Sequence, residues 1–181
     1  TWKSYDYENQ FHITCCGCNE NGDSIGMTVN NFTPTFYVQI PTQYKTWTSD
    51  YTEKFTEFIK KRLGGKKEHL TQIKIVKAKI LYPFTNQKSF PFLKLKFTSQ
   101  AAFKTASYIF KKDIKWHPDQ RPSSWKLYES NIDPMLRFCH TRNINTAGWI
   151  KIKNYVDTQT QFSQCKFNVS VKHTDIEPIL D

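Results

Sequence analysis

Hydrophobic periodicity between residues 35 and 128 constrains the fold of this chain more than any other feature of its sequence. Six segments alternate between a period of two, which is typical of strands, and a period near 3.6, which is typical of helices. They lie at residues 36–40, 50–63, 72–82, 90–97, 99–112 and 125–128. The predicted order is therefore β-α-β-β-α-β, which indicates the α+β class.

The two helices of this region have the clearest local signals. Asp50 and Glu53 have the spacing of a capping box, and Gly64 follows the last residue of the first helix. Ser99 is a suitable N-cap for the second helix. In the strand at 72–82 the alternation slips midway, so we expect a bulge or twist there. With these elements the order matches the ferredoxin-like fold that RNA-recognition modules share.

The flanking segments predict a second, smaller β structure. Residues 10–16 and 25–30 form a predicted hairpin, a third helix begins at Asp133-Pro134, and further strands are expected at 148–153 and 165–171. We therefore predict two subdomains. Residues 1–34 and 143–181 form an antiparallel, OB-like β subdomain, and it packs with an RNA-recognition-like α+β subdomain at 35–142.

Charge and aromatic content favour a nucleic-acid partner. The net charge is +10, and aromatic residues make up 15% of the chain. Single-stranded nucleic acid is held by cations that contact phosphates and by rings that stack on bases. The candidate residues form three groups: Lys60, Lys61, Arg62, Lys66 and Lys67 at the end of the first helix; Phe90, Phe92, Lys94 and Lys96 on one strand face; and Lys151 and Lys153 beside Trp149.

A structural alternative stays open for each group. The helix-end cations also suit the helix dipole and solvent exposure. Phe90 and Phe92 could pack internally beneath the lysine stems, and we expect Trp149 to be buried in a core.

Other functional classes find little support in the sequence. Five cysteines, two of them adjacent, favour a reducing compartment over a disulfide framework, and Cys15-Cys16-Gly17-Cys18 lacks a second ligand pair for zinc. The five histidines fit no hydrolase motif, and no apolar run of about 18 residues predicts a membrane span. We expect no metal and no cofactor in this chain.

Three short blocks in the second half of the chain suggest a family. They are Tyr128-Glu129-Ser130-Asn131-Ile132, Leu136-Arg137-Phe138 and Gly148-Trp149-Ile150. Together they resemble the N-terminal domain of family B DNA polymerases, of the polymerase delta branch and large DNA viruses. Upstream, Asn31-Phe32-Thr33-Pro34 and Phe90-Pro91-Phe92-Leu93-Lys94 are similar in order and spacing. The resemblance covers about residues 10–172, and its residues Tyr128, Glu129, Arg137, Phe138 and Trp149 are expected to be structural, with an ion pair between Glu129 and Arg137.

The resemblance implies a replicative DNA polymerase with a 3′–5′ exonuclease, of which this chain is one N-terminal domain ending just before the exonuclease. Both activities would use Mg²⁺ in the parent enzyme. Asp175-Ile176-Glu177 spells the first exonuclease motif but follows no apolar strand, so we interpret it as a linker. The implied partners are the single-stranded DNA template, the other polymerase domains and a processivity factor, with no membrane. The implied location is intracellular, in the host cytoplasm or nucleus for a virus.

Two alternatives to a polymerase domain remain at this stage. A free-standing nucleic-acid-binding module would bind a short oligonucleotide by itself, although the glycine and aromatic pattern of such modules is missing. A protein-interaction domain would use the aromatic faces as interfaces, and its binding would respond little to salt.

Overall fold

The computed structural model describes residues 1–80, 88–158 and 161–179. The chain forms two compact units. Unit 1 combines Thr1–Thr33 with Ile132–Asp181, and unit 2 is the continuous segment Pro34–Asn131. Each unit has its own cluster of buried apolar side chains.

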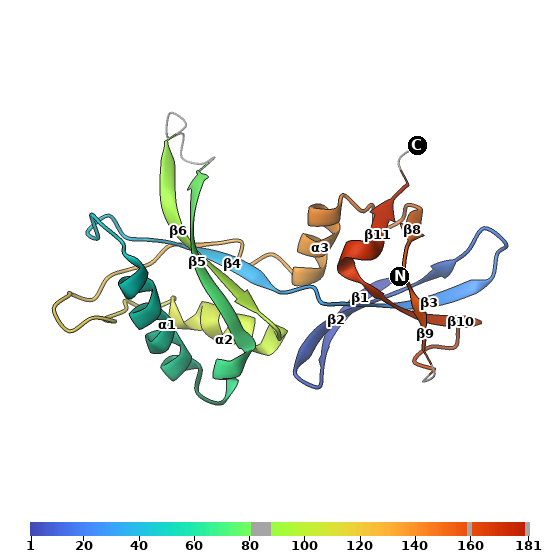
Figure 1. Cartoon of the computed structure of the whole chain (residues 1–181), viewed down its shortest axis with the longest axis horizontal. Helices are drawn as coiled ribbons and strands as arrows, with labels where there is room; N and C mark the ends of the chain where they lie inside the picture. The colour runs from blue at the N-terminus through green and yellow to red at the C-terminus, as the bar shows by residue number, and fades with distance from the viewer. Residues whose placement is uncertain (81–87, 159–160, 180–181) are drawn as a thin grey trace. The chain divides into compact units, whose positions relative to one another are not determined.

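Unit 2 contains a four-stranded antiparallel sheet with two helices on one face (Figure 1). The elements follow the predicted order: β4 (Thr35–Gln39), α1 (Ser49–Leu63), the 3₁₀ helix η1 (Gly64–His69), β5 (Leu70–Lys79), β6 (Ser89–Phe97), α2 (Gln100–Ile109) and β7 (Leu127–Tyr128). The strands are arranged β5-β6-β4-β7 across the sheet. Both α1 and α2 are connected to strands that are not neighbours in this order, so the helices cover the sheet.

The core of unit 2 lies between the helices and the sheet. Leu93, Leu95 and Phe97 alternate along β6 toward the helices, where Phe103 and Phe55 meet them. Trp125 stacks on Phe55 with ring centroids 4.9 Å apart. The indole nitrogen of the buried Trp116 donates to the Tyr44 hydroxyl at 2.8 Å, so its polar group is satisfied inside the core.

Two local details of unit 2 differ from expectation. The N-cap of α1 is Thr48, whose hydroxyl accepts from the Tyr51 amide at 3.2 Å, rather than Asp50 with Glu53. Several neighbouring polar residues can cap, and the backbone path decides between them. The irregularity of β5 falls at Leu70/Gln72, not midway along the strand. The end of the predicted strand, residues 81 and 82, lies outside the described residues.

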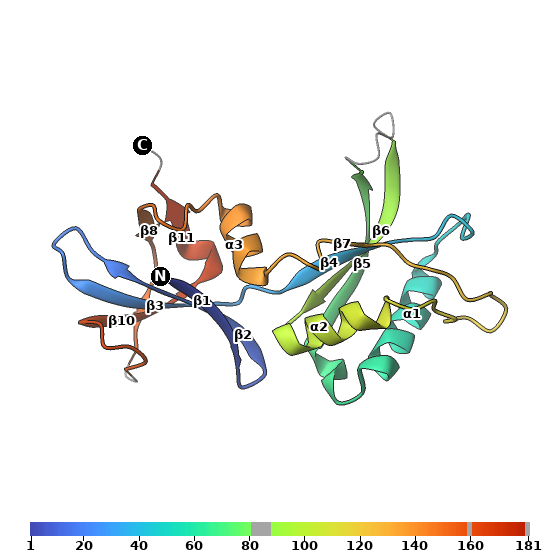
Figure 2. The ribbon, with the colours of Figure 1, turned by 180° about the vertical axis from the view of Figure 1, so that it is seen from behind.

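Unit 1 contains a five-stranded sheet and a separate strand pair (Figure 2). The larger sheet has the order β1-β2-β3-β10-β9, formed by Trp2–Tyr7, Gln10–Cys18, Ser24–Asn30, Phe167–Lys172 and Val156–Asp157. The strand pair is β8 (Ile150–Ile152) with β11 (Ile176–Pro178), and η2 (His173–Asp175) precedes β11. The predicted hairpin is present, but β10 pairs parallel to β3, so the expectation of a wholly antiparallel subdomain was wrong.

The boundary between the units also differs from the predicted one. Helix α3 (Pro134–Arg142) begins at Asp133 as expected, but it belongs to unit 1 and not to the subdomain predicted at 35–142. Phe138 and Cys139 on α3 pack with Phe11, Ile13 and Val171. An apolar helix face shows that the helix is covered but does not identify the surface that covers it, so its sequence could not place it.

Candidate nucleic-acid interface

The sheet of unit 2 has one face without helices, and the predicted cationic strand positions lie there. Side chains alternate along a strand, and Leu93 and Leu95 point toward the helices, so Lys94 and Lys96 point to the opposite face. The register places Tyr37 of β4 opposite Lys94 on one side and Lys74 of β5 opposite Lys94 on the other. We call this surface the open face of unit 2.

Phe92 does not have the exposure that base stacking requires. It is only 3% exposed and belongs to neither apolar core, because neighbours on the open face itself cover it. The ring of Tyr128 meets Phe92 edge-on at 5.2 Å, and the Tyr128 hydroxyl donates to Oε1 of Gln39 at 3.1 Å. Its assignment as a stacking residue is therefore corrected: Phe92 supports the half-buried rings of Tyr37 and Tyr128. Phe90 is half-buried near the beginning of β6.

A hollow of about 650 Å³ lies over part of the open face. Its lining combines rings, lysines and one acid: Tyr37, Phe92, Tyr128, Lys77, Lys79, Lys94 and Glu129, with short apolar side chains of β5. The ammonium group of Lys94 lies 5.7 Å from the centre of the Tyr37 ring, which is a cation–π distance. Lys94 thus places a cation beside a half-buried ring on this surface, with the acid Glu129 also in the lining.

Sequence reasoning missed the contribution of β4 and β5 to this surface. Tyr37 and Lys74 were not among the candidate residues, although the register places both directly beside Lys94. The alternation within each strand is readable from the sequence, but the pairing of β6 with β4 and β5 is not. The neighbours of Lys94 across the sheet therefore required the structure.

The cationic cluster at the end of α1 lies on the helical side of unit 2, away from the open face. Lys66 donates to the Thr105 hydroxyl at 2.9 Å, and Lys67 lies 4.0 Å from the Glu68 carboxylate. The Arg62 guanidinium lies 5.2 Å from the centre of the Phe58 ring. The sheet and core separate this cluster from Lys94 and Lys96, so the structure does not combine the two predicted groups.

The third candidate group lies in unit 1 and has a different environment from the one expected. Trp149 is 53% exposed, so its expected burial in a core was wrong. Ile150 and Ile152 pack against the apolar cluster of unit 1, which leaves Trp149 on the outward side of β8. Lys151 is exposed, whereas Lys153 forms an ion pair of 2.6 Å with Glu177.

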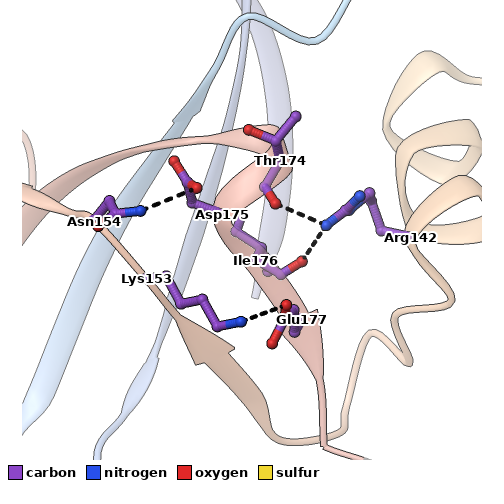
Figure 3. Close-up of polar contacts among 7 residues, drawn as sticks. All are labelled: Arg142, Lys153, Asn154, Thr174, Asp175, Ile176 and Glu177. Carbon is purple, nitrogen blue, oxygen red and sulfur yellow. Dashed lines mark hydrogen bonds and ion pairs between the residues drawn. The ribbon is translucent and has the colours of Figure 1, made fainter.

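Asp175 and Glu177, which resemble the exonuclease motif in sequence, have structural contacts (Figure 3). Glu177 is in β11 beside β8, and its hydrogen bond to Lys153 lowers the pKa of its carboxyl group. Asp175 accepts from the Asn154 amide at 3.4 Å, and Arg142 donates to the carbonyl oxygens of Thr174 and Ile176. The segment is therefore the end of the 3₁₀ helix η2 and the strand β11, not the linker that we expected.

This arrangement does not fit a metal-binding carboxylate pair. Paired metal ions need several oxygen ligands around one point. Glu177 is already neutralised by Lys153, and no group of three acidic, histidine or cysteine ligands occurs among the described residues. We therefore derive no metal-dependent step for this chain.

The five residues that carry the family resemblance are divided between the units. Tyr128 and Glu129 are in unit 2, and Arg137, Phe138 and Trp149 are in unit 1. Phe138 is fully buried and lies in the apolar cluster of unit 1. Glu129 has a backbone φ of 64°, the left-handed conformation that few residues other than glycine adopt. The Glu129–Arg137 ion pair stays a prediction.

The chain is similar to known DNA polymerases. A family model described as DNA polymerase family B, exonuclease domain, matches residues 125–181. The chain is 29% identical to a DNA polymerase of Acanthamoeba polyphaga mimivirus and 30% identical to one of Pyramimonas orientalis virus, in each case over 98% of its own length. It is 25% identical to the DNA polymerase delta catalytic subunit of Schizosaccharomyces pombe over 91% of its length.

A solved structure supports the fold. The family B DNA polymerase of Pyrobaculum calidifontis superposes over 94% of this chain and 20% of its own, with a TM-score of 0.62 and 11% identity. The α+β class is therefore confirmed. Over almost its whole length the chain is similar in sequence to DNA polymerases, and its last third matches the family B model.

The chain is much shorter than these relatives. It spans 11% of the mimivirus polymerase and 15% of the Pyramimonas orientalis virus polymerase. The match to the exonuclease model begins at residue 125, within the region that we placed before that domain, so the predicted boundary stays a prediction. None of the described helices is long and apolar enough to cross a membrane.

Proposed function

We propose that this chain is a non-catalytic, N-terminal part of a replicative DNA polymerase, and that the open face of unit 2 binds the single-stranded template. The whole enzyme would copy DNA inside the cell, in the host cytoplasm or nucleus for a virus, and proofread with a Mg²⁺-dependent 3′–5′ exonuclease. Its other domains, and a processivity factor, would be partners of this chain.

The composition of the open face is the observation that carries the proposal. Lys94 and Lys96 extend from one strand, Lys74 lies opposite Lys94, and the Tyr37 ring is beside them. This combination fits a strand whose phosphates contact ammonium groups while one base stacks on a ring, an interaction of roughly 1–3 kcal/mol per base. Glu129 lines the hollow and would repel phosphates there, so the backbone is expected to follow the lysines.

The non-catalytic part of the proposal has separate support. Phosphoryl transfer in polymerases and exonucleases depends on carboxylates that hold two metal ions. The two acids with the motif spacing, Asp175 and Glu177, have the structural contacts described above. This chain would thus contribute binding and support, and other parts of the enzyme would contribute the chemistry.

Binding of a fluorescent single-stranded oligonucleotide, followed by anisotropy at several salt concentrations, tests the proposed face. We expect the Lys94→Gln/Lys96→Gln variant to bind more weakly and to lower the slope of log affinity against log salt by about 1.4, because each lost phosphate contact removes about 0.7. The matched control is Lys60→Gln/Lys61→Gln on the helical side, which should bind like the wild type.

Three outcomes would contradict the proposal. Equal loss of binding in both variants would mean that the open face is not the site. A salt-independent affinity would favour a protein-interaction surface. Extension or shortening of a primer by the isolated chain with Mg²⁺ and nucleotides would overturn its non-catalytic role.

A further inference from the structure

Two thiols from distant parts of the chain meet on the sheet of unit 1. Cys16 lies on β2, and Cys165 lies two residues before β10. Burial and the neighbouring Cys165 raise the pKa of the Cys16 thiol, and both thiols are free. Cys16 is exposed and Cys165 is half-buried, so a small solute can reach the pair.

A glycine makes room for this contact. Gly26 of β3 pairs with Cys16 on one side and with Asn168 of β10 on the other. A Cβ atom at position 26 would collide with the hydroxyl oxygen of Ser163. The Cys165 amide donates to this Ser163 hydroxyl, so the segment that contains Cys165 crosses close above Gly26, the residue that pairs with Cys16.

Hydrogen bonds hold the Cys165 segment in place. The Ser163 hydroxyl donates to Oδ1 of Asn168 at 2.6 Å, and the Asn168 amide donates to the Cys165 carbonyl oxygen at 3.1 Å. The Lys166 amide donates to the Ser24 hydroxyl at 3.0 Å, and the Lys166 ammonium pairs with Asp23 at 2.8 Å. The segment is thus fixed both internally and to β3, and Cys165 has little freedom to leave Cys16.

We propose that Cys16 and Cys165 form a reversible disulfide, driven by a hydroperoxide, that covalently joins the two chain segments of unit 1. Unit 1 is built from Thr1–Thr33 and Ile132–Asp181, which are connected only through unit 2. Cys16 belongs to the first segment and Cys165 to the second. The proposal does not depend on nucleic-acid binding.

The chemistry needs one equivalent of hydroperoxide. The more exposed Cys16 thiolate attacks a peroxide oxygen, the O–O bond breaks, and Cys16 becomes a sulfenic acid with release of one water. The Cys165 thiolate then attacks the Cys16 sulfur and displaces the second water. In total the two thiols lose two electrons and two protons, and hydrogen peroxide is reduced to two waters.

Proton equilibria set the conditions of the test. Burial and the neighbouring Cys165 raise the pKa of the Cys16 thiol, so the reactive thiolate is scarce at neutral pH. Oxidation is therefore expected to accelerate as the pH rises above neutrality. A stoichiometric amount of hydrogen peroxide at pH 8.5 is a suitable probe.

Tryptic mapping of the oxidised 181-residue chain under non-reducing conditions tests the cross-link. We expect the peptide 4–45 to appear joined to 154–166, at two mass units below their sum, and to separate on reduction. Cys16→Ser and Cys165→Ser should abolish the linked species. Cys18→Ser is the control and should retain it, because Cys18 is also exposed but pairs with Ser24 rather than with Gly26. The melting temperature should rise on oxidation of the wild type but not of Cys16→Ser.

Two results would overturn the proposal. One is complete oxidation of the wild-type thiols without any linked 4–45/154–166 species. The other is a linked species of undiminished yield in Cys16→Ser, which would assign the reaction to Cys15 or Cys18.

Discussion

His173 shows how one partly buried ionisable side chain can make the stability of unit 1 depend on pH. Its ring lies edge-on to the Phe32 ring, with centroids 5.6 Å apart, and Phe32 is part of the apolar cluster. Burial lowers the pKa of His173, nearby Arg142 lowers it further, and Asp175 opposes the shift. Protonation of His173 in the folded chain is therefore unfavourable.

The sign of the pH effect follows from this shift. The ordinary pKa of histidine is 6.5 and the folded value is lower, so between the two values the unfolded chain binds more protons. Stability should therefore decrease as the pH falls below about 6.5. We expect His173→Phe, which keeps a ring against Phe32, to lose less of its melting temperature than the wild type between pH 7.5 and 5.5. If the melting temperature of His173→Phe falls as much as that of the wild type, the assignment to His173 is wrong. The control is His140→Phe, at an exposed position of α3, which should behave like the wild type.

At the scale of the element, the first residues of the helices are set by local sequence. Ser99 and Asp133 were both predicted as N-caps, and their side chains accept from the Ala102 and Met135 amides at 3.0 and 2.8 Å. A cap depends on residues within one turn, so the sequence alone suffices. The strand β10 is different, because its parallel partner β3 lies far away in the chain and no local pattern identifies it.

Loss of the α2 cap should lower the free energy of unfolding more than loss of the α1 cap. Ser99 is only 2% exposed, so its removal leaves the Ala102 amide without a partner in a buried place. We expect Ser99→Ala to lower the free energy of unfolding by about 2 kcal/mol, near the upper end for caps. Thr48→Ala, where the cap is exposed, should cost about 0.5–1 kcal/mol. Urea denaturation of both variants checks this, and an equal or reversed order would contradict it.

At the scale of the whole molecule, the two units differ in whether one continuous piece of chain can form them. Unit 2 is one continuous segment with its own core, whereas unit 1 needs both ends of the chain. In unit 1, strands β2 and β3 come from the first segment, and β10 and α3 come from the second. Folding of unit 1 therefore has to close a loop that contains all of unit 2.

Excised fragments test whether unit 2 folds alone and whether the C-terminal segment of unit 1 does not. Residues 34–131 should give a cooperative thermal transition by circular dichroism, because every residue of the unit 2 core is retained. Residues 132–181 alone should show no cooperative transition, since Phe11, Ile13 and Val29 are missing from their core. A cooperative transition of 132–181, or its absence in 34–131, would contradict the division.

The sequence by itself determined the α+β class, the order of elements in unit 2, the starts of α2 and α3, and the resemblance to family B polymerases. These properties depend on periodicity, caps and short motifs, which are local. Only the tertiary structure decided that α3 joins unit 1, that Phe92 is covered while Trp149 is exposed, and that Tyr37 and Lys74 flank Lys94. Burial and pairing are set by neighbours that are distant in the chain, and the sequence shows the apolar or charged character of a residue without identifying those neighbours.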